Sequence, residues 1–205
     1  MPIYFCFFIN YFRYLDGNHK LIRWRMVVQG GVDGYSRAVV FLRCANNNEA
    51  ATVLEQFMHG TTKFHFPRRI RTDQGHGTEY VEVAKYMLHR YTVATNPVIT
   101  GRSIHNQRIE RLWRDVFTYV LQHYYNLFYY LEANNELNPT NEIEIFSLQY
   151  VFLPRINRAL DVFTVQWNNH PMRTEGNRSP LQIWTQAAQA YVVLRSAVVY
   201  IFGKF

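Results

Sequence analysis

Apolar residues recur every three or four positions between residues 109 and 128. This repeat predicts one long amphipathic helix that must bury a continuous stripe. The stripe consists of Ile109, Leu112, Trp113, Val116, Phe117, Val120, Leu121, Tyr124, Tyr125 and Phe128. Of the 205 residues, 48% are hydrophobic, which argues against disorder. A chain of this length supports one substantial core, against which the helix can pack.

Shorter segments on either side of this helix alternate between strand and helix patterns. Residues 21–44 are predicted to form two strands around a turn that contains Gly and Asp. Two further strands are expected over residues 68–73 and 96–100. Helices are expected over residues 49–59, over 78–90 with Thr78 as N-cap, over 141–167, and after the Ser179-Pro180 pair. This order favours a layered α/β or α+β domain.

Three carboxylates lie at the ends of different predicted elements. Asp16 precedes Gly17, Asp73 ends a strand pattern, and Glu110 begins the long helix on its polar side. Side chains at strand ends can converge at one edge of a sheet, and converging carboxylates need a cation to offset their repulsion. Oxygen-only ligation suits Mg²⁺ or Mn²⁺, and two such ions support phosphoryl transfer. The alternative is ordinary, since Asp before Gly commonly forms turns.

The same three acids lie in blocks that resemble a known catalytic core. The blocks "LDGNH", "TDQG" and "HNQRIERLWRD" are similar to the acidic blocks of retroviral-type integrases and DDE transposases, above all to animal "integrase core domain" proteins. Thirty-six residues lie between Asp73 and Glu110, close to the D,D-35-E pattern. The segment "GGVDGYSRAVVFL" resembles the second and third strands of the family, and "WNNHPMRTEGNRSPLQIW" resembles a later segment.

The resemblance implies an RNase H-like fold, which is a five-stranded mixed sheet with helices on both faces. It covers roughly residues 14–185, with an extra helical insertion at about 122–155. Residues 1–13 would lead into the first strand, and residues 186–205 would form an apolar tail.

The resemblance also implies an activity and its partners. Asp16 would contact both of two Mg²⁺ or Mn²⁺ ions, while Asp73 would hold one ion and Glu110 the other. The expected substrate is DNA, and the expected location of the protein is the nucleus. The chain is expected to form a homodimer or a higher oligomer. No membrane partner is expected, because the apolar end segments are too short or are interrupted by Arg195.

Basic residues beside the acidic blocks are candidates for nucleic-acid contacts. The net charge of +7 suits a polyanionic partner. The candidates are Arg71, Gln107, Arg108, Arg111 and Arg114. Each also has a plainer interpretation: a helix cap for Gln107, a solubilising surface for Arg71, and for the others surface Arg–Glu pairs worth about 0.3–0.5 kcal/mol.

Two rival functions remain open at this point. The zinc-binding module and the barrel that flank retroviral integrase cores are not recognised in this sequence. This motivates a non-catalytic nucleic-acid-binding or protein-interaction module as the alternative to a polynucleotidyl transferase or nuclease. A further option keeps the chemistry and takes an RNA–DNA hybrid as substrate.

Overall fold

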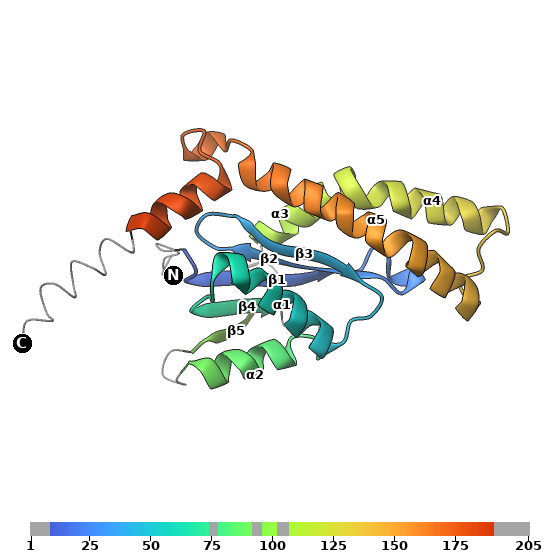
Figure 1. Cartoon of the computed structure of the whole chain (residues 1–205), viewed down its shortest axis with the longest axis horizontal. Helices are drawn as coiled ribbons and strands as arrows, with labels where there is room; N and C mark the ends of the chain where they lie inside the picture. Colours follow the sequence, from blue (N-terminus) through green and yellow to red (C-terminus); the bar gives the residue numbers. More distant parts are fainter. Residues whose placement is uncertain (1–8, 74–77, 92–95, 102–106, 191–205) are drawn as a thin grey trace, which may run out of the picture.

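The protein forms a five-stranded mixed sheet covered by helices on both faces (Figure 1). The computed structural model describes residues 9–73, 78–91, 96–101 and 107–190. The strands are β1 (Phe12–Asn18), β2 (Val27–Asp33), β3 (Val39–Ala45), β4 (Arg69–Asp73) and β5 (Val98–Gly101), in the order β3-β2-β1-β4-β5. β1, β2 and β3 pair antiparallel, whereas β1 with β4 and β4 with β5 pair parallel. The expected sheet is confirmed.

Each face of the sheet carries its own apolar core. Helices α1 (Ala50–Phe64) and α2 (Val81–Arg90) cover one face, and α3 (Gln107–Val116), α4 (Gln122–Ala133) and α5 (Glu142–Asn169) cover the other. Successive strand residues point to opposite faces. Leu15 therefore packs with α1 and α2, while Tyr14 packs on the α3 side. The side chain of Asp16 then points to the α3 side as well.

The predicted long helix is present, with one irregular turn. α3, a π-helix over Phe117–Leu121 and α4 follow one another directly. The ring of Trp24 contacts three aromatic rings of α4 edge-on, at centroid distances of 5.8, 5.1 and 5.0 Å. The expected insertion therefore shares a core with the sheet rather than forming a separate unit.

The expected boundaries are wrong in three places. Residues 22–24 form a 3-10 helix, and β2 begins only at Val27, because Arg25 adopts a left-handed φ of 55°. α1 runs on to Phe64 rather than ending at His59, and Gly60 lies inside it, close to the Phe41 side chain. The N-cap position of α2 is Tyr80, not Thr78.

Two asparagines of α5 cover the free edge of β3. Asn157 accepts from the backbone N–H of Cys44 at 2.8 Å and donates to its carbonyl at 3.0 Å. Asn168 does the same with Val39, at 2.8 and 2.9 Å. Eleven helical residues and five strand residues both span about 16.5 Å, so the two pairs stay in register. The side-chain amides thus replace a neighbouring strand and protect the edge.

The chain after α5 follows the sequence prediction. Ser179 Oγ accepts from the N–H of Gln182 at 3.2 Å, and Gln182 Oε1 accepts from the N–H of Ser179 at 2.9 Å, which is a capping box. Within the described ranges, no helix is both long and apolar enough to traverse a bilayer. Residues 1–8 and 191–205 lie outside the described chain, so the expectations for the two end segments stay predictions.

Candidate active site

Asp16 lies inside the central part of the sheet, not at a strand end as expected. Pairing between β1 and β2 continues past it to Asn18, and Asp16 itself is opposite Gly30. Its Oδ1 accepts from the backbone N–H of Gly17 at 2.9 Å, and its Oδ2 accepts from the indole N–H of Trp113 at 2.9 Å. The half-buried carboxylate is therefore held by one local and one long-range donor.

Gly30 makes room for the ring that holds Asp16. A Cβ at Gly30 would lie 2.9 Å from Cη2 of Trp113, closer than ordinary packing permits. The indole thus lies against the backbone of β2 while its N–H reaches across to β1. This contact joins α3 to the middle of the sheet.

Asp73 is the last residue of β4, and β4 pairs with β1, the strand that carries Asp16. The parallel register pairs Phe12 with Arg69 and Tyr14 with Arg71. Continued by two residues, it brings Asp73 level with Asp16, and parallel partners at one level point to the same face. On its other side Asp73 pairs with Gly101 of β5. Residues 74–77, the rest of the second acidic block, lie outside the described chain.

Glu110 lies in the first turn of α3 and is exposed. Residues three apart are neighbours on a helix surface, so Glu110 lies one turn before Trp113 on the same side of α3. Because Trp113 is bonded to Asp16, the helix that carries Glu110 is fixed against the strand that carries Asp16.

A polar network lies behind Asp16 on the other face of the sheet. The Tyr80 hydroxyl donates to Gln29 Oε1 at 2.7 Å, and Gln29 Nε2 donates to Asn48 Oδ1 at 2.6 Å. Burial raises the pKa of the Tyr80 phenol well above its usual range, and the negative charge of Asp16 raises it further. Tyr80 therefore stays protonated and acts as a donor.

The three carboxylates suit a hard cation as ligands, although the described residues do not form a group that could hold one. Asp16, Asp73 and Glu110 offer only carboxylate oxygens, the ligand type that Mg²⁺ and Mn²⁺ prefer. The two Asp16 oxygens accept from different donors, the N–H of Gly17 and the indole N–H of Trp113. Within the described ranges, no three His, Cys, Asp or Glu side chains form a group that could hold a metal ion.

A model of a known protein family matches almost the whole chain. The model of the "Integrase core domain" family matches residues 3–196. The chain belongs to the integrase core domain family. No curated protein sequence matches it.

Solved structures confirm the RNase H-like fold of this integrase core domain. The HTLV-2 integrase catalytic core domain, solved with magnesium, matches in a trimeric form (TM-score 0.52, 14% identity, 86% of this chain and 97% of that one). Its dimeric form matches with a TM-score of 0.53 and 15% identity, over 87% and 98% of the two chains. A simian T-cell lymphotropic virus intasome, in complex with the PP2A regulatory subunit B56 gamma, matches at 0.58 and 16%, over 89% of this chain and 57% of that one.

The three arginines of α3 lie on different sides of the helix relative to Glu110. Residues on a helix are 100° apart, so Arg108 lies about 160° around the axis from Glu110. Arg108 and Arg111 line a pocket on the opposite flank of α3, together with Asp115. Arg114 is the one that follows Glu110 at the i+4 position, and it lies 3.3 Å from Asp115. Only Arg114 therefore extends the side of α3 that carries Glu110.

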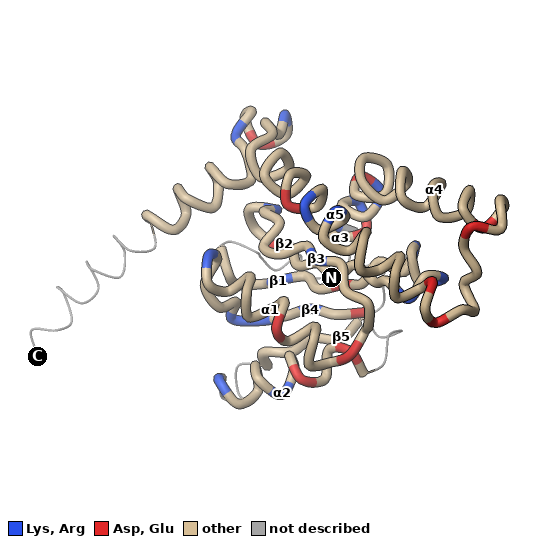
Figure 2. The backbone as a smooth tube through the Cα atoms, turned by 45° about the vertical axis from the view of Figure 1, so that its right-hand side comes forward, with Lys and Arg blue, Asp and Glu red and all other residues tan. Residues whose placement is uncertain are grey.

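The other two candidates for nucleic-acid contacts are Arg71 and Gln107. Arg71 points to the same face as Tyr14, its partner in β1, and lies beside Gly101: a Cβ there would be 3.2 Å from Arg71 Nη2. Asp16 and Asp73 point to the same face. Gln107 begins α3, but its side chain lies outside the described residues. In Figure 2, basic segments occur on α1, on α2 and just after α5, so positive charge is spread over several faces.

Sequence reasoning missed the residues that support the acids. Trp113 was assigned only to the apolar stripe, yet its N–H is what reaches Asp16. Its place three residues after Glu110 was the available signal, because an indole on that side of the helix carries a donor toward the same site. Gln29 and Tyr80 gave no such signal, since their contact joins residues 51 positions apart.

Proposed function

We propose that this integrase core domain cuts or joins DNA strands by phosphoryl transfer with two divalent cations. The observation that carries the proposal is the 2.9 Å hydrogen bond from Trp113 to Asp16. It ties the helix of Glu110 to the central strand, next to the strand that ends at Asp73. This connection supports the proposal that three acids from separate parts of the sequence act together.

Each acid has a separate role in the proposal. Asp16 would hold both cations, Asp73 one and Glu110 the other. When bound, such ions activate the attacking oxygen and stabilise the leaving oxygen. Trp113 and the N–H of Gly17 fix the orientation of the Asp16 carboxylate. That the similar HTLV-2 core was solved with magnesium supports this choice of ion.

DNA is the proposed substrate, and a nucleus is the proposed location. The net charge of +7 and the placement of Arg71 beside the acidic face support a polyanion. A homo-oligomer is part of the proposal because the HTLV-2 core occurs in dimeric and trimeric forms. Light scattering on the purified chain tests this, and a monomer at every concentration would exclude it.

The test is metal-dependent strand nicking and joining by wild type, Asp73→Asn and a control. We expect activity with Mg²⁺ or Mn²⁺ to fall more than about 100-fold in Asp73→Asn, since loss of an outer-shell partner alone costs 10–100-fold. Asp161→Asn is the control, because Asp161 lies on α5, is 66% exposed and pairs only loosely with Arg43 at 3.4 Å. Equal activity in all three proteins would remove the assignment. A duplex and an RNA–DNA hybrid, assayed in parallel, identify the substrate.

A non-catalytic nucleic-acid-binding module is the second candidate. It is favoured by one observation: the described residues form no group able to hold a metal ion. This candidate predicts salt-sensitive DNA binding without turnover, unchanged by the carboxylate substitutions. Absence of DNA binding at low salt would exclude it.

A further inference from the structure

A pocket of about 520 Å³ lies on the flank of α3 that faces away from Glu110. Its walls come from three parts of the chain: the turn between β2 and β3, α3, and the C-terminal end of α5 with the residues after it. Four arginines line it, namely Arg37, Arg108, Arg111 and Arg173. Trp167 and Met172 provide apolar surface between them.

Positive charge in this pocket exceeds the negative charge near it. Arg37 Nη2 pairs with Glu175 Oε1 at 2.9 Å. In the part of the chain that the structure describes, no ion pair involves Arg108, Arg111 or Arg173. The carboxylate of Asp115 also lines the pocket, but its ion-pair partner is Arg114. Three guanidinium groups are therefore available to an anion.

The turn that carries Arg37 is fixed by several contacts at once. Asp33 Oδ2 accepts from the N–H and the hydroxyl of Ser36, at 2.8 and 2.7 Å. Arg37 adopts a φ of 64°, which is unfavourable for a residue with a side chain. The indole N–H of Trp167 donates to the backbone carbonyl of Arg37 at 3.1 Å, and Glu175 accepts from the guanidinium of Arg37. Such a conformation persists only where the surroundings determine it, so the position of Arg37 is built into the fold.

The chemistry of the pocket selects a phosphate group. Guanidinium groups bind phosphate oxygens through paired N–H donors. The apolar surface of Trp167 and Met172 suits the sugar or base attached to a phosphate, and bare inorganic anions would leave it unused. Because Glu110 and the pocket lie on opposite flanks of α3, a strand that crosses the helix would pass both.

The geometry points to a second phosphate-binding site, formed by Arg37, Arg108, Arg111 and Arg173, which holds a backbone phosphate of bound nucleic acid. The inference rests on the proposed function for its substrate class only, since it needs no cation and no catalysis. A free phosphate compound presents the same chemistry and is the other source to be distinguished.

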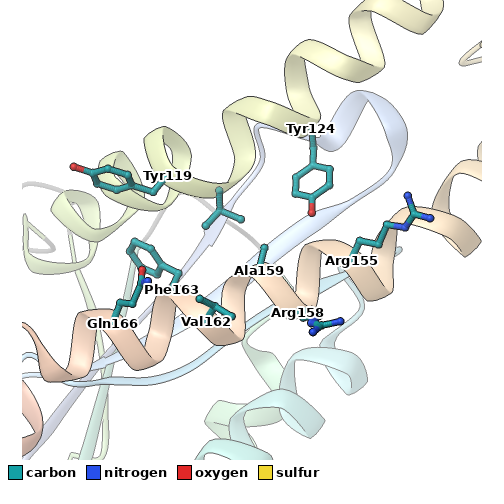
Figure 3. A pocket seen from close by; sticks show the side chains of 9 residues that line it. Tyr119, Tyr124, Arg155, Arg158, Ala159, Val162, Phe163 and Gln166 are labelled. Atoms are coloured by element: carbon teal, nitrogen blue, oxygen red, sulfur yellow. The ribbon is translucent and has the colours of Figure 1, made fainter.

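The experiment measures DNA binding as a function of salt in the presence of EDTA. A short labelled duplex is titrated with wild type, Arg108→Gln/Arg111→Gln and a charge-matched control, Arg155→Gln/Arg158→Gln. The control arginines project from α5 beside a separate groove that is bounded by Tyr119, Tyr124 and Phe163 (Figure 3). Both double variants lose the same net charge, so they differ only in which site is changed.

Each phosphate contact contributes about 0.9 to the slope of log K against log salt, so the pocket variant should lower the slope by about 1–2. The control should keep the slope of wild type. Arg173→Gln, which changes a different element, should lower the slope by about 1 and replaces the double variant if that protein does not fold. Equal slopes in wild type and pocket variants, or equal losses in pocket and control variants, would overturn the site.

A second arm titrates inorganic pyrophosphate against the melting temperature. If pyrophosphate stabilises wild type while the pocket variants keep the wild-type DNA slope, a nucleic-acid backbone is excluded as the source. The test also stays separate from the proposed catalysis, because binding is measured in EDTA. A protein that never cuts a strand can therefore still confirm or overturn the pocket.

Discussion

The indole nitrogen of Trp113 lies 2.9 Å from Oδ2 of Asp16, although 97 positions separate the two residues in the sequence. This bond connects the first turns of α3 to the middle of β1. The orientation of Asp16 and the place of Glu110 therefore depend on the same side chain. Two of the substitutions below, Trp113→Phe and Gly30→Ala, act on this bond or on the packing around it.

Trp113→Phe should keep the apolar contact and remove the donor to Asp16. We expect metal-dependent activity to fall about 10–100-fold, the usual effect of losing an outer-shell partner. The matched control is Trp184→Phe, because the buried Trp184 Nε1 has no hydrogen-bond partner in the described structure. Activity assays and calorimetric cation titrations on both variants provide the measurement. Equal effects of the two substitutions would show that the Trp113 N–H has no special role.

Gly30→Ala should destabilise the fold through Trp113. The added methyl would lie 2.9 Å from Cη2 of the indole, a ring that cannot easily move. Overpacking of this kind costs about 1–3 kcal/mol, or about 2–4 °C of melting temperature for each kcal/mol in a chain of this size. Gly101→Ala is the control, since its methyl would meet only the flexible end of Arg71 at 3.2 Å. A larger loss in Gly101→Ala than in Gly30→Ala would contradict the packing described.

Asn168→Ala should leave two backbone groups at the edge of β3 without hydrogen-bond partners. Val39 would lose the acceptor for its N–H and the donor to its carbonyl, in a buried setting. Each such group costs about 1–3 kcal/mol when left unpaired. Asn169→Ala is the control, because Asn169 is exposed and bonds only within its own helix. Denaturant unfolding of both variants measures the difference, and equal midpoints would rule out the edge pairing.

Stability should fall at alkaline pH because of Cys44. Burial raises the pKa of its thiol from 9.0 to about 12. The unfolded chain therefore loses this proton first, so the contribution is complete below pH 9.0 and is lost as the pH rises toward about 12. The full effect is at most about 4 kcal/mol. Cys44→Ala should show a smaller alkaline loss in the unfolding midpoint than wild type. Parallel curves for the two proteins would refute this.

Local sequence patterns predicted most of the elements, and pairing across the sheet explains where they failed. The stripe from Ile109 to Phe128 is one continuous helical region because its period is a local property. Asp16 was placed at a strand end because Gly17 follows it, yet β2 extends the pairing to Asn18. Trp24 was assigned to a strand, but its partners lie on α4, about a hundred residues later.

The three acids of the site stay a prediction from the sequence, and most of the residues around them were not predicted. The resemblance identified Asp16, Asp73 and Glu110, and the structure directs their elements to one face. The 100° turn per helical residue already implied that Arg108 lies on the flank of α3 away from Glu110. The pocket on this flank could not be predicted, because Arg37 and Arg173 belong to other parts of the chain.

Calorimetric titration of Mg²⁺ and Mn²⁺, in the presence of a short DNA duplex, tests whether Asp16 and Glu110 are metal ligands. The proteins compared are wild type, Asp16→Asn/Glu110→Gln and the control Asp161→Asn. We expect wild type and the control to bind the cations and the double variant not to bind them. Cation binding that survives in the double variant, or that is missing from wild type, would contradict the assignment of these carboxylates as metal ligands.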